Sequence, residues 1–560
     1  MKSDLLRKPS YTDIILMLSF VLIGGFHEWV SAVISILLLV FVIYKCSVNK
    51  KVKLSSNLLL VSLAVIFLFY LLSAFWAVDS GMAFLGAIKF LPPLLFLFAF
   101  DQENVNKENT YNVISVTTSF LVIVTSLLSL IPELTSHFTV AGRLAGTFQY
   151  PNSFAMLILI SELLILKKDK FKVFDYIMLL VLIFGIIYTG SRTVFVLFIL
   201  SNVVLFFVKG SKKYRIIFLV ALLLLFAVVF LLRENYIVQR YLNISIFEST
   251  FIGRILYFYD ALPLLIKYPF GMGYLGYNYI YPTIQSGLYS TRFVHNDFLQ
   301  FFLDIGWIPS LLFIFTIIKK IFSRKTDKYV KIIISTLCLH ILFDFDLQFI
   351  SLFLVLVILL KSDNEPKEIN PKFNILISIT SVILIALNVY MGIHLVFSYF
   401  SLNYQAAKMY PYNTENNIAI LKTNSNIVEV NNLATDIMHQ NEVTYIPYTV
   451  KSGYAYATGD FNKLIQYNRK LLELNSFENS HYENYARMLI VGAQKYIEAG
   501  DFESAEYCMS EITTLKSSLE KVPLKLSRLG KRIKDQPNAN LSDEVLNYIK
   551  ETEELLSKAK

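Results

Sequence analysis

Cationic side chains occur beside turn-forming residues at four points that are distant in the chain. Arg143 lies in GRLAGTFQYPN, Arg192 in TGSRT, Arg254 at the end of IGR and His295 in VHNDFLQ. A cation at a membrane boundary needs an anionic partner or a water-filled cavity. Four such positions on one side of a membrane therefore indicate a single anion-binding site. Taken one at a time, an arginine at a span end can instead reach lipid phosphate, and a lone histidine is commonly structural.

The elements that position these residues are predicted to be membrane-spanning helices. The 560 residues are 55% hydrophobic and 17% charged, with 46 phenylalanines, which excludes a soluble globular class. Runs of about 17 to 25 mostly apolar residues can cross a bilayer. The chain offers thirteen such runs before residue 401: 11–26, 29–44, 57–76, 82–100, 111–131, 152–166, 173–189, 193–208, 216–232, 298–318, 332–347, 349–361 and 373–400. The sequence thus predicts an all-α, polytopic membrane helix bundle of about 12 to 13 transmembrane helices.

The orientation of this bundle follows from the lysines and arginines of its short loops, which are retained on the cytoplasmic side. Such residues cluster after the second, sixth, eighth and tenth predicted spans. We therefore expect a cytoplasmic N-terminus in the cell membrane and, from the odd number of spans, an outer location for everything after residue 400. All four cationic positions then face outward, two of them in a long outer loop, 233–295. The net charge of +9 reflects this bias, so no nucleic-acid partner is expected.

Glycines and tyrosines surround the cationic positions. Gly142, Gly146, Gly190 and Gly271 indicate non-helical backbone, which within a membrane must line a cavity and can expose N–H groups to an anion. Glycine equally serves close helix packing. The outer loop is rich in tyrosine, which suits an interfacial belt or stacking on sugar rings. These patterns are consistent with a site at the outer face.

Acidic and amide side chains near these positions have two interpretations each. Asp344 and Asp346 form a D-x-D pair, but a hard cation would gather more oxygen ligands, so we expect a polar cap or arginine partners and no metal. Asn296 and Asp297 can position the His295 imidazole, or begin the following helix as an N-cap. The three cysteines fall in different predicted compartments, so neither a disulfide nor a thiolate metal site is expected.

From residue 401 onward the chain becomes soluble in character, with mixed charge. The segments AYATGDFNKLIQYNRKLLELN at 455–475 and YIEAGDFESAEYCMSEI at 496–512 share a G-D-F turn with an alanine just before it. This pattern is typical of tetratricopeptide-type helical hairpins, so we predict an extracytoplasmic α-helical repeat domain at 401–560 beside a transmembrane domain at 1–400. Such a domain is more often a binding scaffold than a catalytic unit, although a rigid cap over the outer opening is also possible.

The chain resembles the O-antigen ligase and polymerase family, membrane enzymes that move glycans from a polyprenyl diphosphate lipid. The resemblance covers residues 60–360 and rests on GRLAGTFQYPNSFA at 142–155, TGSRTVFVLF at 189–198, GRILYFYDALPLLIKYPFGMGYLGY at 253–277 and VHNDFLQFFLDIGWIPSLLF at 294–313. It implies a bundle of about a dozen helices and a reaction without metal or nucleotide cofactor. By the same resemblance, Arg192 and Arg254 contact the lipid diphosphate, Arg143 is a further basic position, and His295 is the functional histidine.

The resemblance implies a glycosyltransferase that moves glycan from an undecaprenyl-diphosphate-type donor to an acceptor hydroxyl on the outer face. The arginines would stabilise the leaving diphosphate, and His295 would accept the hydroxyl proton or only orient a substrate. A lipid-linked glycan acceptor would make the enzyme a polymerase, and lipid A core, wall polymer or protein a ligase. The alternatives are a transporter for lipid-linked oligosaccharides, which should carry polar groups on both faces, and a non-catalytic scaffold.

Overall fold

The computed structural model describes residues 8–48, 52–55, 57–103, 105–209, 215–216, 219, 223, 234–245, 247–362, 365–368 and 372–559. These residues are mostly helical, and their strands form two short antiparallel pairs, β1–β4 and β2–β3. The chain divides into two compact units. Unit 1 comprises Met1–Ser73, Phe84–Ser245 and His295–Val396, and unit 2 comprises Ala74–Ala83, Ile246–Val294 and Phe397–Lys560.

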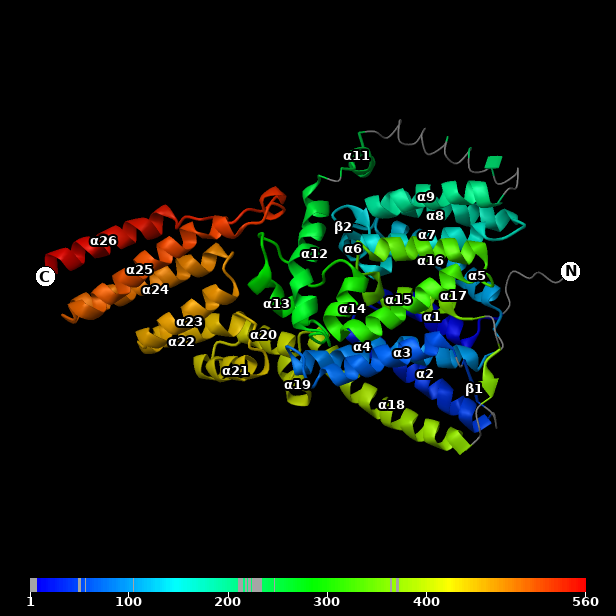
Figure 1. The fold of residues 1–560 in the computed structure, drawn as a ribbon, viewed down its shortest axis with the longest axis horizontal. Coiled ribbons are helices and arrows are strands. Elements are labelled where there is room, and N and C mark those ends of the chain that lie inside the picture. The colour runs from blue at the N-terminus through cyan, green and yellow to red at the C-terminus, as the bar shows by residue number, and fades with distance from the viewer. Residues whose placement is uncertain are drawn as a thin grey trace. The chain divides into compact units, whose positions relative to one another are not determined.

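Unit 1 is a helix bundle (Figure 1). Its elements are α1 (Tyr11–Val21), η1 (Ile23–Gly25), α2 (Glu28–Val48), β1 (Lys53–Leu54), α3 (Leu58–Ser73), most of α4 (Ser80–Asp101), α5 (Lys107–Leu128), α6 (Pro132–Phe138), β2 (Thr139–Val140), β3 (Arg143–Leu144), η2 (Gly146–Phe148), α7 (Pro151–Leu166), α8 (Val173–Thr189), α9 (Arg192–Lys209), α11 (Tyr236–Leu242), α14 (Asp297–Ile305), α15 (Trp307–Phe322), α16 (Lys328–Ile341), η3 (Asp346–Gln348), α17 (Ile350–Leu360), β4 (Lys367–Glu368) and most of α18 (Lys372–Tyr399).

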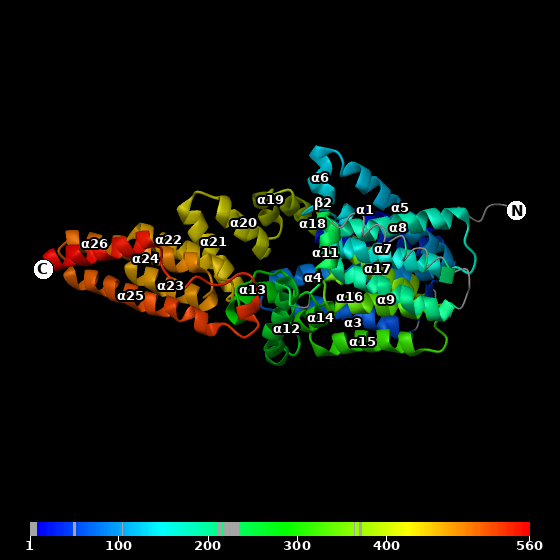
Figure 2. The same cartoon turned by 90° about the horizontal axis from the view of Figure 1, so that it is seen from above.

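Helices α7 and α17 form the centre of unit 1. Every residue of α17 is buried, as is every residue of α7 except Asn152. Helix α7 packs against α5, α8, α9 and α16, while α17 packs against α1, α15 and α16. Figure 2 shows both helices in the middle of the bundle. A helix that is apolar on all sides is expected at the centre of a membrane bundle, where neighbouring helices cover it.

Six described helices are long and apolar enough to cross a membrane: α2, α4, α5, α9, α12 and α18. The shorter apolar helices are α1, α3, α7, α8 and α17. The chain is therefore that of a helical membrane protein, and the predicted number of spans stays a prediction. Helix α12 meets the same criterion although we place it in the outer loop. The ninth predicted span, 216–232, lies outside the described residues except for 216, 219 and 223.

The predicted span 298–318 is not one continuous helix. The structure divides it into α14 and α15 at Gly306, which has φ 78° and ψ −168°. This conformation is readily available only to glycine. A hydropathy pattern averages over one such residue, which explains why the sequence suggested an unbroken span. Helix α16 likewise ends at Ile341, before the predicted end of its span at residue 347.

Loops that we predict on one side of the membrane contact one another. At the end predicted to be cytoplasmic, Lys53 and Leu54 of β1 pair with β4, and the Lys167 ammonium lies 2.5 Å from a Glu108 carboxylate oxygen. At the other end, β3 contacts α8, and η3 contacts α14 and α16. We call these ends the inner rim and the outer rim of unit 1. The lysine bias of the loops, and not the fold, determines which rim we place in the cytoplasm.

Unit 2 combines the outer-loop helices with the C-terminal part of the chain. Its elements are α12 (Ser249–Lys267), α13 (Gly276–Ile284), α19 (Asn403–Met409), α20 (Thr414–Thr423), α21 (Ile427–Gln440), α22 (Ile446–Thr458), α23 (Phe461–Leu474), α24 (Asn479–Glu498), α25 (Phe502–Glu520), η4 (Val522–Lys525), η5 (Gly530–Arg532) and α26 (Asp543–Ala559). Helices α22 and α23 pack together, as do α24 and α25.

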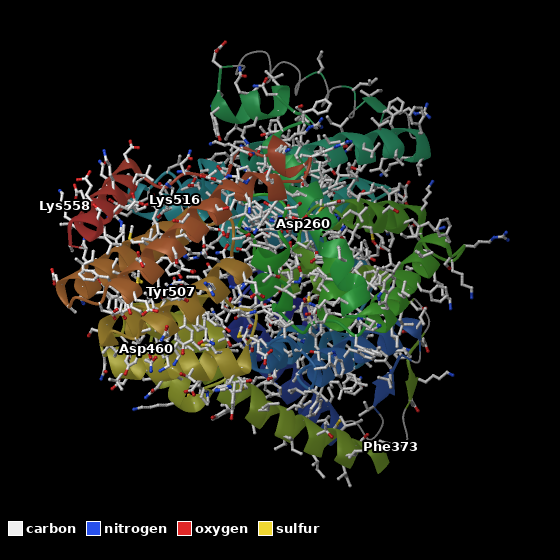
Figure 3. All side chains as sticks on the ribbon, turned by 60° about the vertical axis from the view of Figure 1, so that its left-hand side comes forward. Asp260, Phe373, Asp460, Tyr507, Lys516 and Lys558 are labelled. Carbon is white, nitrogen blue, oxygen red and sulfur yellow. The ribbon has the colours of Figure 1, made fainter. Side chains whose placement is uncertain are left out.

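The repeated G-D-F motif forms the turn of each helix pair. Gly459 and Gly500 both have positive φ, 76° and 74°, as expected for a residue that ends a helix. The next residue, Asp460 or Asp501, accepts a hydrogen bond from a backbone N–H three residues later, at 3.1 Å in both turns (Asp460 is labelled in Figure 3). The motif therefore ends one helix and begins the next in each pair. Its assignment to tetratricopeptide-type repeats stays a prediction.

The outer-loop residues of unit 2 are joined to its C-terminal residues. Asp260 of α12 accepts hydrogen bonds from the Ser286 N–H and hydroxyl and from the Tyr289 hydroxyl, at 2.6 to 2.9 Å. The Ser286 carbonyl in turn accepts from the N–H of Ser527 at 2.9 Å. A Cβ at Gly287 would lie 2.8 Å from the Cα of Gly530, so neither glycine leaves room for a side chain. The loop after α12 is thus fixed against the C-terminal segment.

Candidate functional site

A tight hairpin at the outer rim positions Arg143. Strands β2 and β3 are joined by Ala141 and Gly142, which both have positive φ, at 50° and 71°. Such a turn directs the first residue of β3 back toward the bundle. The Arg143 guanidinium donates to the Thr189 carbonyl at 2.8 Å and to the amide oxygen of Asn152 at 2.7 Å. The hairpin therefore brings Arg143 to the end of α8 and to the start of α7.

The turn between α8 and α9 lies next to this guanidinium. Gly190 ends α8 with φ 60°, and the Ser191 carbonyl accepts the N–H of Phe195 at 2.9 Å as α9 begins. The Ser191 hydroxyl is buried, and no hydrogen-bond partner is found for it among the described residues. Arg192 is the first residue of α9. A helix N-terminus carries partial positive charge and unpaired N–H groups, which favour a bound anion.

A third arginine, Arg240 of α11, completes the cluster, and the sequence analysis did not single it out. Tyr241 fixes α11 by donating its hydroxyl to the Ile187 carbonyl at 2.9 Å, and its ring lies 4.3 Å from that of Phe195. A Cβ at Gly190 would lie 3.4 Å from the Arg143 Nε and 3.5 Å from the Arg240 Nε. Figure 1 shows α11 beside the ends of α8 and α9. We call Arg143, Arg192 and Arg240 the arginine cluster.

The arginine cluster concentrates like charge in a partly buried place. The pKa of Arg143 is lowered to about 10, chiefly by burial and also by the charges of Arg240 and Arg192, with Tyr150 and Tyr241 acting in the opposite direction. The guanidinium nevertheless stays protonated at neutral pH. The described contacts of Arg143 are with carbonyl and amide oxygens, which leave its charge unneutralised. An anionic ligand with several oxygens would relieve this repulsion and accept paired hydrogen bonds.

Asp344 connects the arginine cluster to the histidine of the site. Its side chain is fully buried and accepts hydrogen bonds at 2.8 Å from the Tyr150 hydroxyl and from the Asn152 amide. Because Asn152 also accepts from Arg143, one contact chain runs from Arg143 through Asn152 to Asp344. We predicted an arginine partner for this carboxylate, and the described contacts reach Arg143 through one amide.

His295 lies at the other end of the contact chain. Its Nδ1 is 3.6 Å from the Oδ1 of Asp344, and its ring meets the Phe345 ring edge to face at 4.9 Å. The backbone has φ 55°, a left-handed conformation that few side chains tolerate. The side chain is 21% exposed, so the imidazole is reachable while its carboxylate partner is not. The Asp344 carboxylate thus lies on the Nδ1 side of the ring, beyond hydrogen-bond distance, and an imidazole of this kind can accept a proton at Nε2.

The second acid of the D-x-D pair has different partners. Asp346 contacts the buried His340 and accepts from the Ser153 hydroxyl at 2.6 Å. These groups tie η3 to α16 and α7. Among the residues that the structure describes, no cluster of three His, Cys, Asp or Glu side chains is placed to hold a metal ion. Asp344 and Asp346 therefore belong to separate networks, one partly exposed through His295 and one fully buried.

Asn296 and Asp297 both have structural contacts. The Asn296 side chain accepts the N–H of Leu299 at 3.0 Å and so caps α14. Asp297 is buried and accepts the N–H of Leu347 at 2.7 Å. These contacts hold the backbone on either side of His295 and Asp344. A direct role of either residue in substrate binding stays a prediction.

Arg254 belongs to unit 2. It lies in the first half of α12, and its charge acts on Tyr257, as does that of Asp535 in the C-terminal segment. Of the four cationic positions predicted from sequence, the structure therefore brings Arg143, Arg192 and His295 together in unit 1, and it places Arg254 in unit 2. We make no structural assignment of Arg254 to the arginine cluster.

Comparison with known proteins supports the resemblance noted in the sequence. Residues 177–314 match the family model described as O-antigen ligase. The matched range contains Arg192, Arg240 and His295 and ends before Asp344. No curated protein sequence matches the chain. The family match supports a membrane protein with a glycosyltransferase-like function.

Proposed function

We propose that the chain is a membrane glycosyltransferase that moves a glycan from an undecaprenyl-diphosphate-linked donor to an acceptor hydroxyl at the outer face. One observation carries this proposal: a continuous contact chain, Arg143–Asn152–Asp344–His295, links the arginine cluster to the exposed imidazole. The arginine cluster suits a diphosphate, and the imidazole suits a reacting hydroxyl. The match of 177–314 to the O-antigen ligase family model supports the same assignment.

The arginine cluster is assigned to the leaving group. During transfer the acceptor oxygen forms a bond to the anomeric carbon, and the bond from that carbon to the diphosphate oxygen breaks. The electron pair stays with the diphosphate, whose negative charge increases in the transition state. Arg143, Arg192 and Arg240 are fixed beforehand around Gly190, so they stabilise that charge without rearranging.

His295 is assigned to the acceptor. Its Nε2 accepts the proton that the acceptor hydroxyl loses on attack, and the Asp344 carboxylate stabilises the resulting imidazolium. Burial of Asp344 with three polar neighbours keeps this carboxylate in one position. The step is balanced because the proton of the acceptor hydroxyl goes to His295 and the electron pair of the broken bond goes to the diphosphate. Arg254 is proposed as a further contact to the donor on the strength of the resemblance.

Several acceptors are compatible with this chemistry. A lipid-linked glycan as acceptor gives a polymerase, whereas a wall polymer, lipid A core or a protein gives a ligase. The proposed donor and the outer location follow from the arginine cluster and the lysine bias of the loops. The C-terminal residues of unit 2 are proposed to lie on the same outer side, because they pack with the loop 246–294.

The proposal is tested by glycan transfer from a purified lipid-linked donor to a panel of acceptors in detergent. We expect transfer by wild type, and a loss of roughly 100-fold or more in His295→Asn and in Arg192→Ala. Asparagine tolerates the left-handed backbone at position 295, so this variant should keep the fold. Lys168→Ala at the inner rim is the matched control, and it should transfer at the wild-type rate.

Two results would contradict the assignment. Normal transfer by folded His295→Asn and Arg192→Ala would remove these residues from the reaction. Donor binding without transfer to any acceptor, together with donor movement across proteoliposome membranes, would favour a transporter.

A further inference from the structure

A groove lies on the surface of the C-terminal helices of unit 2, outside every residue discussed for transfer. It has a volume of about 560 Å³ and is lined by α21, α22, α23 and α25. Three tyrosines contribute rings to it: Tyr448, Tyr467 and Tyr507. The rings of Tyr448 and Tyr467 are 6.5 Å apart, and Tyr507, labelled in Figure 3, is 47% exposed. The size of the groove lies within the range of about 300 to 1,000 Å³ that is usual for small-ligand sites.

The polar lining of the groove consists of amides and paired charges. Asn462 and Gln466 are exposed and lie one helical turn apart on α23. The Arg469 guanidinium donates two hydrogen bonds to Glu511, at 2.9 and 2.6 Å, and Lys470 contacts Glu473 at 2.8 Å. The cations that line the groove are thus already neutralised by carboxylates. The groove therefore offers hydrogen bonds and ring faces without a net charge that would select an ion.

Contacts with the neighbouring helices fix the residues that line the groove. The Glu511 carboxylate that pairs with Arg469 is buried and also accepts the Tyr485 hydroxyl at 2.9 Å. On the other side of α23, the Asn468 amide donates to the Ser452 hydroxyl at 2.6 Å. These contacts fix α23 against α22, α24 and α25. A site whose side chains are fixed before binding loses less conformational entropy when a ligand arrives.

We infer that this groove binds a segment of an uncharged glycan chain. Flat aromatic rings pack against the apolar faces of pyranose rings, and amides and paired charges exchange hydrogen bonds with the hydroxyls at their edges. A bound peptide would instead need aliphatic pockets for its anchors, and here Met438 and Ile465 are the aliphatic members of the lining. Together the lining therefore favours a polyhydroxylated ligand over a peptide.

The identity of the glycan rests on the proposed function, since a transferase of growing or finished chains presents such a ligand to its own outer domain. The groove would hold sugar units of the glycan other than the one that reacts. If the groove has this role, it retains long glycan chains on the protein. It takes no part in forming the new bond at His295. Failure of the groove and failure of the transferase assignment can therefore be observed separately.

The test measures binding of fluorescent oligosaccharides, cut from the surface polysaccharide of the producing cells, to the full-length protein in detergent. We expect saturable binding that weakens about tenfold or more in Tyr467→Ala/Tyr507→Ala, because each lost stacking contact corresponds to a several-fold change in Kd. Tyr548→Ala removes a tyrosine of α26 with similar exposure, at 42%, and should bind like wild type. Arg143→Ala should also bind normally while losing transfer.

Three outcomes would overturn the inference. One is equal oligosaccharide binding by wild type and by the folded double variant. Another is the absence of saturable oligosaccharide binding by wild type at millimolar concentration. The third is saturable binding of a labelled random-peptide pool that the double variant loses while oligosaccharides do not bind, which would make the groove a peptide site.

Discussion

The two rims of unit 1 carry cations of different kinds in different surroundings. At the inner rim three lysines contact carboxylates, Lys167 with Glu108, Lys168 with Asp175 and Lys361 with Asp101, at 2.5 to 2.6 Å. Others, such as Lys209 and Lys320, contact backbone carbonyls. At the outer rim they are arginines, and Arg143 and Arg240 contact neutral oxygens of Thr189, Asn152 and Gly190. These three inner lysines are thus neutralised by the protein, whereas the described contacts of Arg143 and Arg240 leave their charges unneutralised.

This difference separates topology from function. Lysines of short cytoplasmic loops orient the chain through their number, so their exact placement matters little for orientation. Arginines around a buried helix N-terminus each need a defined position, because the directions of their guanidinium N–H groups determine where an anion binds. The comparison therefore predicts that substitutions at the outer rim will alter chemistry and that matched substitutions at the inner rim will not.

The largest effect is expected for Arg143→Ala. We predict a fall of about 100- to 1,000-fold in the transfer rate, because this guanidinium anchors Asn152 and, under the proposed function, also contacts the donor diphosphate. Arg143→Lys should recover part of the rate, since the lysine restores the positive charge but not the two parallel hydrogen bonds of a guanidinium. Lys168→Ala at the inner rim serves as the control, and initial rates with purified donor measure all three. Comparable losses at the two rims would remove the distinction between them.

Asp344→Asn should reduce kcat by roughly 100-fold with little change in the KM for the donor, because the amide no longer stabilises an imidazolium at His295. Asp346→Asn is the matched substitution two residues away, in the buried network of His340 and Ser153. Asp346→Asn should lower the melting temperature clearly while it changes kcat only slightly. If instead Asp346→Asn abolishes turnover in a folded protein and Asp344→Asn does not, the assignment of the two acids is reversed.

Arg240→Ala tests whether the third arginine belongs to the site. Since Arg240 approaches Gly190 at the edge of the cluster, we expect about tenfold weaker donor binding, seen as a raised KM, with kcat changed less than for Arg143→Ala. Arg215→Ala removes an arginine from the predicted cytoplasmic side and should leave KM unchanged. An unaltered KM in Arg240→Ala would restrict the cluster to Arg143 and Arg192.

The smallest effect is expected for Asn296→Ala. Loss of the cap on α14 should lower the free energy of unfolding by about 1 kcal/mol, while transfer stays within about threefold of wild type. Asn296→Ser restores a capping oxygen and should recover the stability. Thermal unfolding and transfer rates on the same preparations check both parts. A large loss of transfer in a stable Asn296→Ala protein would show that Asn296 contacts substrate.

Local signals in the sequence predicted much of the site. Gly190 beside Arg192, and the turn residues around Arg143, indicated non-helical backbone next to cations, and both turns are present. The G-D steps of the C-terminal domain likewise indicated where helices end and begin. These features depend on a few neighbouring residues, so their physics can be read from short segments.

Other features depend on contacts between distant segments, which spacing does not reveal. Arg240 has no flanking turn residue, and its place follows from Tyr241 packing on α8 and α9. Asn152 begins a long apolar run, where an amide resembles an ordinary helix start. The interruption of the span 298–318 at Gly306 was missed because hydropathy does not register one backbone angle. The first two omissions concern tertiary packing, and the third concerns a single backbone conformation.

The central claim is that the outer arginine cluster, and not the inner lysines, holds the diphosphate of the donor. The most direct measurement is equilibrium binding of undecaprenyl diphosphate, without glycan, to purified protein in detergent. Wild type is compared with Arg143→Ala/Arg192→Ala/Arg240→Ala and with Lys167→Ala/Lys168→Ala. We predict that the triple variant binds at least about 100-fold more weakly and that the inner-rim variant binds like wild type. Equal affinity of wild type and the folded triple variant would contradict the account.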